Sequence, residues 1–125
     1  MLPFSITLAP GQSPFRQVVY AATRAIVAGQ MPSGTAFPSV RELSQALKIN
    51  PNTAHKIVAE LVRMGLLEVR PGVGTIVALP PDTSPAARRA LLTDQTEALV
   101  VEAKRLGLSR EEVLAAFNAQ WDALS

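Results

Sequence analysis

Four polar side chains lie within five positions of one another, directly after an Asn50-Pro51 pair: Asn52, Thr53, His55 and Lys56. Amide and hydroxyl groups both donate and accept hydrogen bonds, and lysine and histidine add further donors. His55 is the only histidine, and no aspartate, serine or cysteine motif accompanies it. The chain also has no phosphate-binding loop and no spacing suited to a metal. The cluster therefore predicts recognition through hydrogen bonds, with no enzyme activity and no cofactor.

Hydrophobic residues recur at helical spacing in three segments around this cluster. The first begins at Pro14, with Ser13 as N-cap and Gly29 as the stop, and the third runs from about Pro51 to Gly65. The second opens at Ser39, where Glu42 follows at the spacing of a capping box. Its expected buried stripe consists of Val40, Leu43, Ala46 and Leu47.

Two β-like runs follow the third helix. They are predicted over Leu66 to Arg70 and Thr75 to Leu79, joined by the loop Pro71-Gly72-Val73-Gly74. Helix, turn, helix and hairpin in this order form the layout of a winged helix-turn-helix, which places one helix in a DNA major groove. We therefore predict a winged helix-turn-helix DNA-binding domain over residues 1–79.

This layout assigns roles to the polar residues. The start of the third helix, with Asn52, Thr53, His55 and Lys56, is expected to contact base edges and phosphates. At the start of the second helix, Arg41 is expected to reach the DNA, and Ser39 to offer its backbone N–H to a phosphate. The hairpin residues Arg70, Gly72 and Gly74 are expected to lie along the flanking minor groove.

Each of these residues also has a plain structural explanation. A capped, solvated helix start accounts for the polar cluster, and a surface arginine paired with an acid accounts for Arg41. The glycines are also what a tight hairpin turn requires. The order of the elements favours DNA binding over these explanations.

Charge divides the chain in the same place. Residues 1–80 hold seven basic and three acidic side chains, a net charge of +4, whereas residues 81–125 hold five basic and seven acidic ones, a net charge of −2. A basic N-terminal part is expected to meet a polyanion.

The remaining segment, residues 80–125, is predicted to be a two-helix dimerisation region. Pro80-Pro81-Asp82 is predicted to be a hinge. One long helix is expected over 84–107, with Ser84 as its N-cap. The last helix is expected to begin with a capping box at Ser109. The hydrophobic stripe comprises Leu92, Leu99, Leu106, Val113, Phe117 and Trp121. It either closes a core within the chain or pairs with a second copy. We favour the homodimer, because two DNA-binding domains related by symmetry need a symmetric interface between the chains.

Composition favours a cytoplasmic protein. The 125 residues include no cysteine, which excludes disulfides and thiolate metal sites. The N-terminus lacks the basic and apolar regions of a signal peptide, and no run approaches the roughly 18 apolar residues of a membrane span. No membrane partner is expected.

The motifs together resemble the GntR family of bacterial transcription regulators. The matching segments are Pro14-Phe15-Arg16-Gln17, Gly34 to Leu43, Ile49 to Thr53 and Gly65 to Val77. The resemblance implies that Arg41, Asn52, Thr53, His55 and the hairpin around Gly72 and Gly74 touch DNA. With only two helices after the hairpin, the chain looks like the small YtrA subfamily, whose members are typically homodimeric repressors of their own operon and of neighbouring transporter genes.

The sequence thus predicts a mainly α fold with a small β-hairpin, in which a winged helix-turn-helix is followed by two C-terminal helices. The expected partners are a double-stranded, pseudo-palindromic DNA operator and a second copy of the chain. An unknown small-molecule effector would act at the dimer interface. The alternatives are a winged-helix module that binds proteins and a small-ligand sensor with its pocket between the C-terminal helices.

Overall fold

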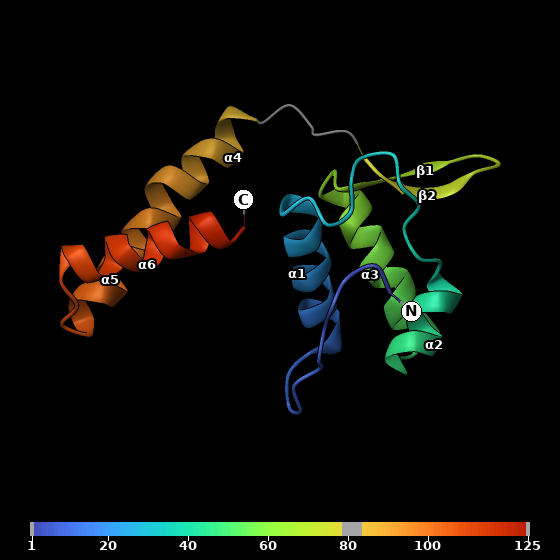
Figure 1. Cartoon of the computed structure of the whole chain (residues 1–125), viewed down its shortest axis with the longest axis horizontal. Helices are drawn as coiled ribbons and strands as arrows, with labels where there is room; N and C mark the ends of the chain where they lie inside the picture. The colour runs from blue at the N-terminus through green and yellow to red at the C-terminus, as the bar shows by residue number, and fades with distance from the viewer. Residues whose placement is uncertain (1, 79–83, 125) are drawn as a thin grey trace. The chain divides into compact units, whose positions relative to one another are not determined.

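The computed structural model describes residues 2–78 and 84–124, so the predicted hinge at Pro80-Pro81-Asp82 lies outside the described residues. The chain divides into two compact units, Met1–Pro81 and Asp82–Ser125. The first holds α1 (Pro14–Val27), α2 (Val40–Leu47), α3 (Pro51–Arg63), β1 (Leu67–Arg70) and β2 (Gly74–Val77) (Figure 1). The second holds α4 (Pro85–Arg89), a π-helical turn η1 (Ala90–Gln95), α5 (Thr96–Arg105) and α6 (Arg110–Ala123). The predicted fold class is confirmed.

In the first unit, α1 and α2 both pack against α3. The largest fully buried side chains come from all three helices and both strands: Val18, Leu43, Ile57, Leu61, Leu67 and Val77. Ser13, Ser39 and Asn50 cap the three helices with side-chain oxygens that accept backbone hydrogen bonds. One prediction is wrong: Ala46 is exposed. Leu43 is the one buried side chain of the eight-residue α2, and Leu47, not Ala46, packs from its last turn against the core.

The hairpin is joined to the segment that leads into α2. The two strands are antiparallel, with Leu67 opposite Val77 and Arg70 opposite Gly74. Alongside β2, the Phe37 N–H donates to the Thr75 carbonyl and the Val77 N–H to the Thr35 carbonyl, both at 2.9 Å. A hairpin of two strands is only marginally stable alone. This third segment therefore fixes the base of the wing. The predicted strand end at Leu79 lies outside the described residues.

The N-terminal segment, to which the sequence analysis gave no role, packs on the same core. Phe4 is buried and stacks on Phe37 with ring centroids 6.1 Å apart. The Gln17 side chain holds the segment from α1, because it accepts from the Ala9 N–H at 2.7 Å and donates to the Ala9 carbonyl at 3.2 Å. These contacts join residues far apart in the chain.

The second unit departs from the predicted single helix over 84–107. A π-helical turn, η1, interrupts it, and the Thr96 hydroxyl donates to the Leu91 carbonyl five residues back at 2.8 Å. Such a turn holds one extra residue relative to a regular helix. Leu92 lies within it, and its place in the predicted stripe stays a prediction. The caps at Ser84 and Ser109 form as predicted.

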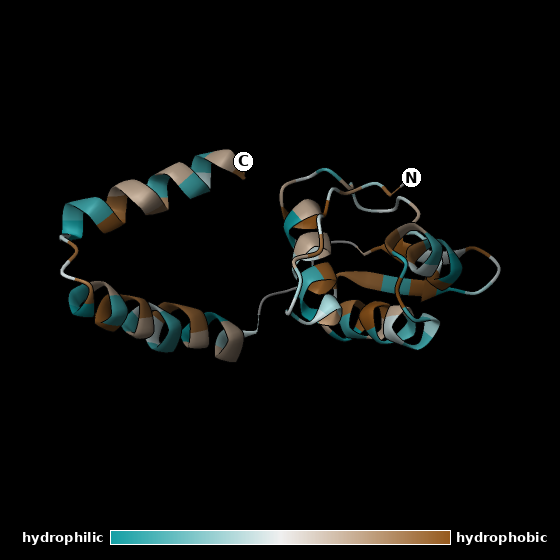
Figure 2. Cartoon of the chain, turned by 90° about the horizontal axis from the view of Figure 1, so that it is seen from below, coloured by the Kyte–Doolittle hydropathy of each residue, from teal (hydrophilic) through white to brown (hydrophobic). Residues whose placement is uncertain are grey.

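Hydrophobic and hydrophilic residues alternate along the helices of this unit (Figure 2). Ala103, with 7% exposure, is its only buried hydrophobic residue among those described. Within residues 2–78 and 84–124, none of the helices has the length and hydropathy of a membrane span.

Candidate nucleic-acid interface

The first turns of α3 present a polar surface. The Asn50 side chain caps the helix by accepting from the Asn52 N–H at 2.7 Å, and Pro51 occupies the first turn, where its missing N–H has no consequence. Ala54, Ile57 and Leu61 are fully buried on the opposite face. Residues three or four positions apart share a face of a helix, so the exposed Asn52, His55 and Lys56 form one surface. Thr53 is half-buried at its edge.

The start of α2 holds the second group of predicted contacts. Ser39 forms a complete capping box with Glu42: its hydroxyl accepts from the Glu42 N–H, and its own N–H donates to Glu42 Oε1, both at 3.1 Å. That N–H already has an acceptor, so a phosphate would have to displace Glu42 Oε1, and the contact of Ser39 with DNA stays a prediction. The next N–H groups, of Val40 and Arg41, have no partner within the helix. Arg41 is exposed beside them.

The capping box makes the stability of this region depend on pH. The hydrogen bonds from the Ser39 backbone and hydroxyl hold the pKa of Glu42 below its ordinary value of 4.5. A carboxylate with a lowered folded-state pKa stabilises the fold above the unfolded pKa and loses that effect as pH falls through the folded one.

We expect Glu42→Gln to lower the melting temperature at pH 7 and to have no effect once the pH lies well below 4.5. Glutamine keeps an acceptor for the Ser39 N–H, so this comparison isolates the charge. Thermal unfolding of both proteins across this pH range measures the difference. A gap between them that persists in acid would contradict the assignment.

The wing carries the third group. Arg70 pairs with Glu68 at 2.8 Å, and both side chains are exposed. Gly72 has φ of 76° and Gly74 has φ of 111°, in the region where other residues are strained, and no atom lies within 4 Å of the place a Cβ would take. The glycines are thus required by the turn itself. Arg70 must leave Glu68 to contact DNA, which is a small change because exposed ion pairs contribute little.

We expect Glu68→Gln to raise DNA affinity about two- to fivefold at low salt, because it releases Arg70 and removes a negative charge from the wing. Titration of a labelled duplex at several salt concentrations measures the change. Glu102→Gln is the matched control, since Glu102 forms a similar pair with Arg105 in the second unit. Equal affinity of Glu68→Gln and the wild type would show that the wing does not approach DNA.

The predicted residues thus occupy three neighbouring elements of one unit: the start of α2, the start of α3, and the wing, whose base is joined to the segment before α2. Lys48, in the turn between α2 and α3, is a further exposed cation beside these elements. It occupies the position where a helix commonly ends in glycine.

The model of the bacterial regulatory proteins of the gntR family matches residues 15–77, half of the chain. This match covers α1, the helix-turn-helix and the wing. The chain belongs to the GntR family. Members of the family are transcriptional regulators that bind DNA and are not enzymes, so the chain is a DNA-binding transcriptional regulator.

Two helix-turn-helix relatives of the chain come from Bacillus subtilis. The uncharacterized helix-turn-helix regulator YhcF is 35% identical over 89 residues, which cover 71% of this chain and 74% of YhcF. The transcriptional repressor YtrA is 29% identical over 100 residues, covering 79% and 77%. A crystal structure of a transcriptional antiterminator from Listeria monocytogenes shares the fold, with a TM-score of 0.82, 24% identity, and coverage of 97% and 91%. The match to YtrA confirms the resemblance to its small subfamily.

Proposed function

We propose that this GntR-family chain is a homodimeric repressor that binds a pseudo-palindromic operator upstream of its own operon and of a neighbouring transporter gene. Each α3 would lie in a major groove, with half-sites one helical turn of about 10 base pairs, or a multiple, apart. Asn52, Thr53, His55 and Lys56 would contact bases and phosphates. Ser39, Arg41, Arg70, Gly72 and Gly74 would contact the flanking backbone and minor groove.

The observation that carries this proposal is the exposed polar surface of Asn52, His55 and Lys56 at the start of α3. The apolar face of the helix is buried against α1 and α2, so this surface is free for a partner. Hydrogen-bonding side chains at this end of the helix match the base edges of a major groove. The repressor role is supported by the relative YtrA, which is a transcriptional repressor.

The homodimer is supported by the second unit, whose large hydrophobic side chains are mostly exposed in one chain, even though Phe117 and Trp121 stack on each other. Leu99 is 52% exposed and Trp121 is 67% exposed, although both belong to the predicted stripe. Leu92, Leu106 and Phe117 are exposed as well, and Val113 is half-buried. Exposed apolar surface of this extent is typical of an interface. A second copy of the same unit would cover it.

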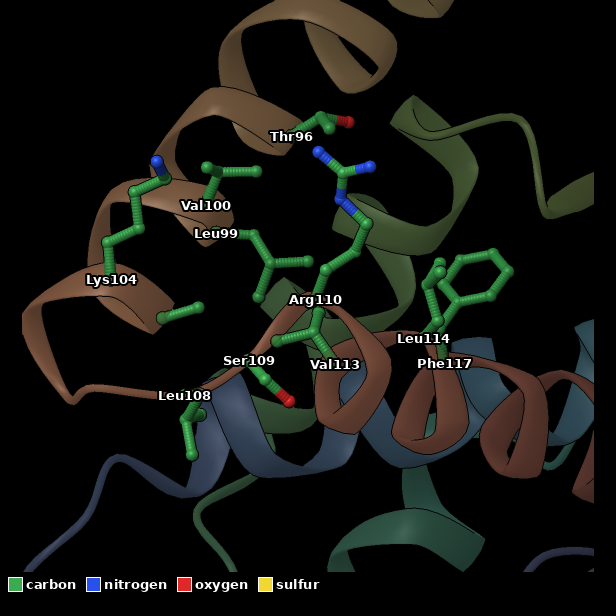
Figure 3. Close-up of a pocket in the computed structure, with 11 residues that line it drawn as sticks. Thr96, Leu99, Val100, Lys104, Leu108, Ser109, Arg110, Val113, Leu114 and Phe117 are labelled. Carbon is green, nitrogen blue, oxygen red and sulfur yellow. The ribbon is translucent and has the colours of Figure 1, made fainter.

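Between α5 and α6 lies an apolar groove with a volume of about 460 Å³. Leu99 and Val100 line it from α5, and Val113, Leu114 and Phe117 line it from α6 (Figure 3). Apolar helix faces pack against one another in dimers, so the groove would receive side chains of the partner copy.

The groove also favours a second candidate function, the sensing of a small apolar effector. Its volume suits such a ligand, and Lys104 and Arg110 lie at its lining as polar groups. A ligand there would act by favouring one arrangement of the two chains in the dimer. Thermal shift against a library of apolar acids tests this candidate, and no stabilisation by any compound would count against it.

The main test is a gel shift with DNA from upstream of the chain's own gene, over a series of salt concentrations, together with light scattering of the free protein. A repressor dimer should have twice the 13.3 kDa chain mass and bind DNA steeply less well as salt rises. A reporter fused to the same upstream DNA should be expressed more strongly when the chain is absent. A folded protein without salt-sensitive binding would favour a protein-interaction module.

A further inference from the structure

Lys48 has an unusual backbone conformation. It lies at φ 55° and ψ 46°, in the left-handed region, and it is the only residue other than glycine with positive φ among those described. The Lys48 N–H donates to the Ser44 carbonyl, which also accepts from the Ile49 N–H at 3.1 Å. This left-handed turn ends α2 and allows the chain to reverse into α3.

A side chain at this position is a disadvantage for stability. A Cβ in the left-handed conformation lies too close to the following carbonyl, which is why helices commonly end in glycine there. Asparagine is the usual second choice, because its short polar side chain bonds locally. Lysine offers no such local bond, and Lys48 is exposed rather than part of the core.

The position of Lys48 gives its charge a use. It lies two residues before Asn50, the N-cap of α3, at the end of that helix which carries Asn52 and His55. A helix whose first turn lies in a major groove about 12 Å wide has a phosphate ridge on each side of that turn. The connection that leads into the helix must pass one of these ridges. In the described part of the chain, Lys48 has no ion-pair or hydrogen-bond partner for its ammonium group.

We propose that Lys48 is a phosphate-binding residue of the DNA interface, retained at the end of α2 in place of the glycine that would make the fold more stable. This inference rests on the proposed DNA-binding role of α3 and adds a contact that the helix-turn-helix layout alone does not assign. Phosphate contacts position a protein on DNA without reading sequence. Lys48 therefore contributes to affinity for any duplex.

Three variants separate the charge from the backbone strain. Lys48→Arg keeps both, Lys48→Ala removes the charge and keeps the strain, and Lys48→Gly removes both. Binding to a duplex of arbitrary sequence should depend on charge alone. The slope of log affinity against log salt should fall by about 0.9 for each bound chain, or about 1.8 for a dimer, in the alanine and glycine variants and remain unchanged in the arginine variant. Stability should depend on strain alone, with Lys48→Gly melting about 4 °C or more above Lys48→Ala.

Arg24→Ala provides the matched control, because Arg24 is an exposed cation of α1 in the same unit to which no DNA contact is assigned. If the wild type binds the duplex and Lys48→Ala binds with the same salt slope, or if Arg24→Ala lowers the slope equally, the inference is overturned and the proposed function stands. If the wild type shows no salt-dependent binding to any duplex, both are overturned.

Discussion

Replacing Asn52 by alanine is expected to weaken operator binding about 5- to 150-fold, which corresponds to the roughly 1–3 kcal/mol of a bidentate contact to a base. Asn52 is exposed in the first turn of α3, and its backbone N–H, not its side chain, takes part in the Asn50 cap. The substitution therefore leaves the cap and the core of the domain intact. Adding His55→Ala should abolish the preference for the operator over random DNA. Titration of both duplexes measures this preference.

Gln30→Ala is the control, since Gln30 is an exposed amide in the loop after α1. It should bind the operator as the wild type does. Circular dichroism should show the same helix content in all variants. An Asn52→Ala protein with unchanged operator affinity would remove α3 from the interface, even if binding to DNA in general remained.

The other large effect is expected from Leu99→Glu in α5. Leu99 lines the groove between α5 and α6 and is half exposed in the single chain, so a carboxylate there would be buried without a partner in a dimer. We expect light scattering to give the 13.3 kDa mass of one chain. Operator affinity should fall by about 100-fold or more. In a dimer, binding of one DNA-binding domain holds the second at a high effective concentration near its half-site, and a single chain lacks this gain.

Ala98→Glu is the matched control. Ala98 is the exposed residue before Leu99 and points about 100° away from it around the helix. It lies on the same face of α5 as the exposed pair of Glu102 and Arg105. The substitution introduces the same charge at the adjacent position of α5 and should leave the protein dimeric. If Leu99→Glu is also dimeric, the proposed interface is wrong, and the two chains must associate through another surface.

Those features of the fold that depend on neighbouring residues were predictable from the sequence. The caps at Ser13, Ser39, Ser84 and Ser109 form because a hydroxyl three residues before an open N–H can reach it without help from the rest of the chain. The order of helices and strands followed from hydrophobic periodicity. The location of the proposed DNA-binding residues followed from that order.

Features that depend on distant residues or on small energy differences were not predictable. The stacking of Phe4 on Phe37 joins segments whose meeting no local pattern specifies. The π-helical turn η1 differs from a regular helix by one residue, which periodicity alone does not resolve. The Glu68–Arg70 pair required knowledge of two side-chain rotamers on one strand.

The hydrogen bonds between the Thr35 and Phe37 segment and β2 have a consequence for how the wing evolves and how it binds. They immobilise the stem of the hairpin, whereas the tip around Val73, which is 72% exposed, touches little of the unit. Amide hydrogen exchange should be slow at Phe37 and Val77 and faster at Val73, whose N–H donates only within the exposed turn, to the Arg70 carbonyl. The stem loses its conformational entropy during folding and not during association. Insertions and substitutions in the tip can therefore alter reach and operator preference while the scaffold remains unchanged.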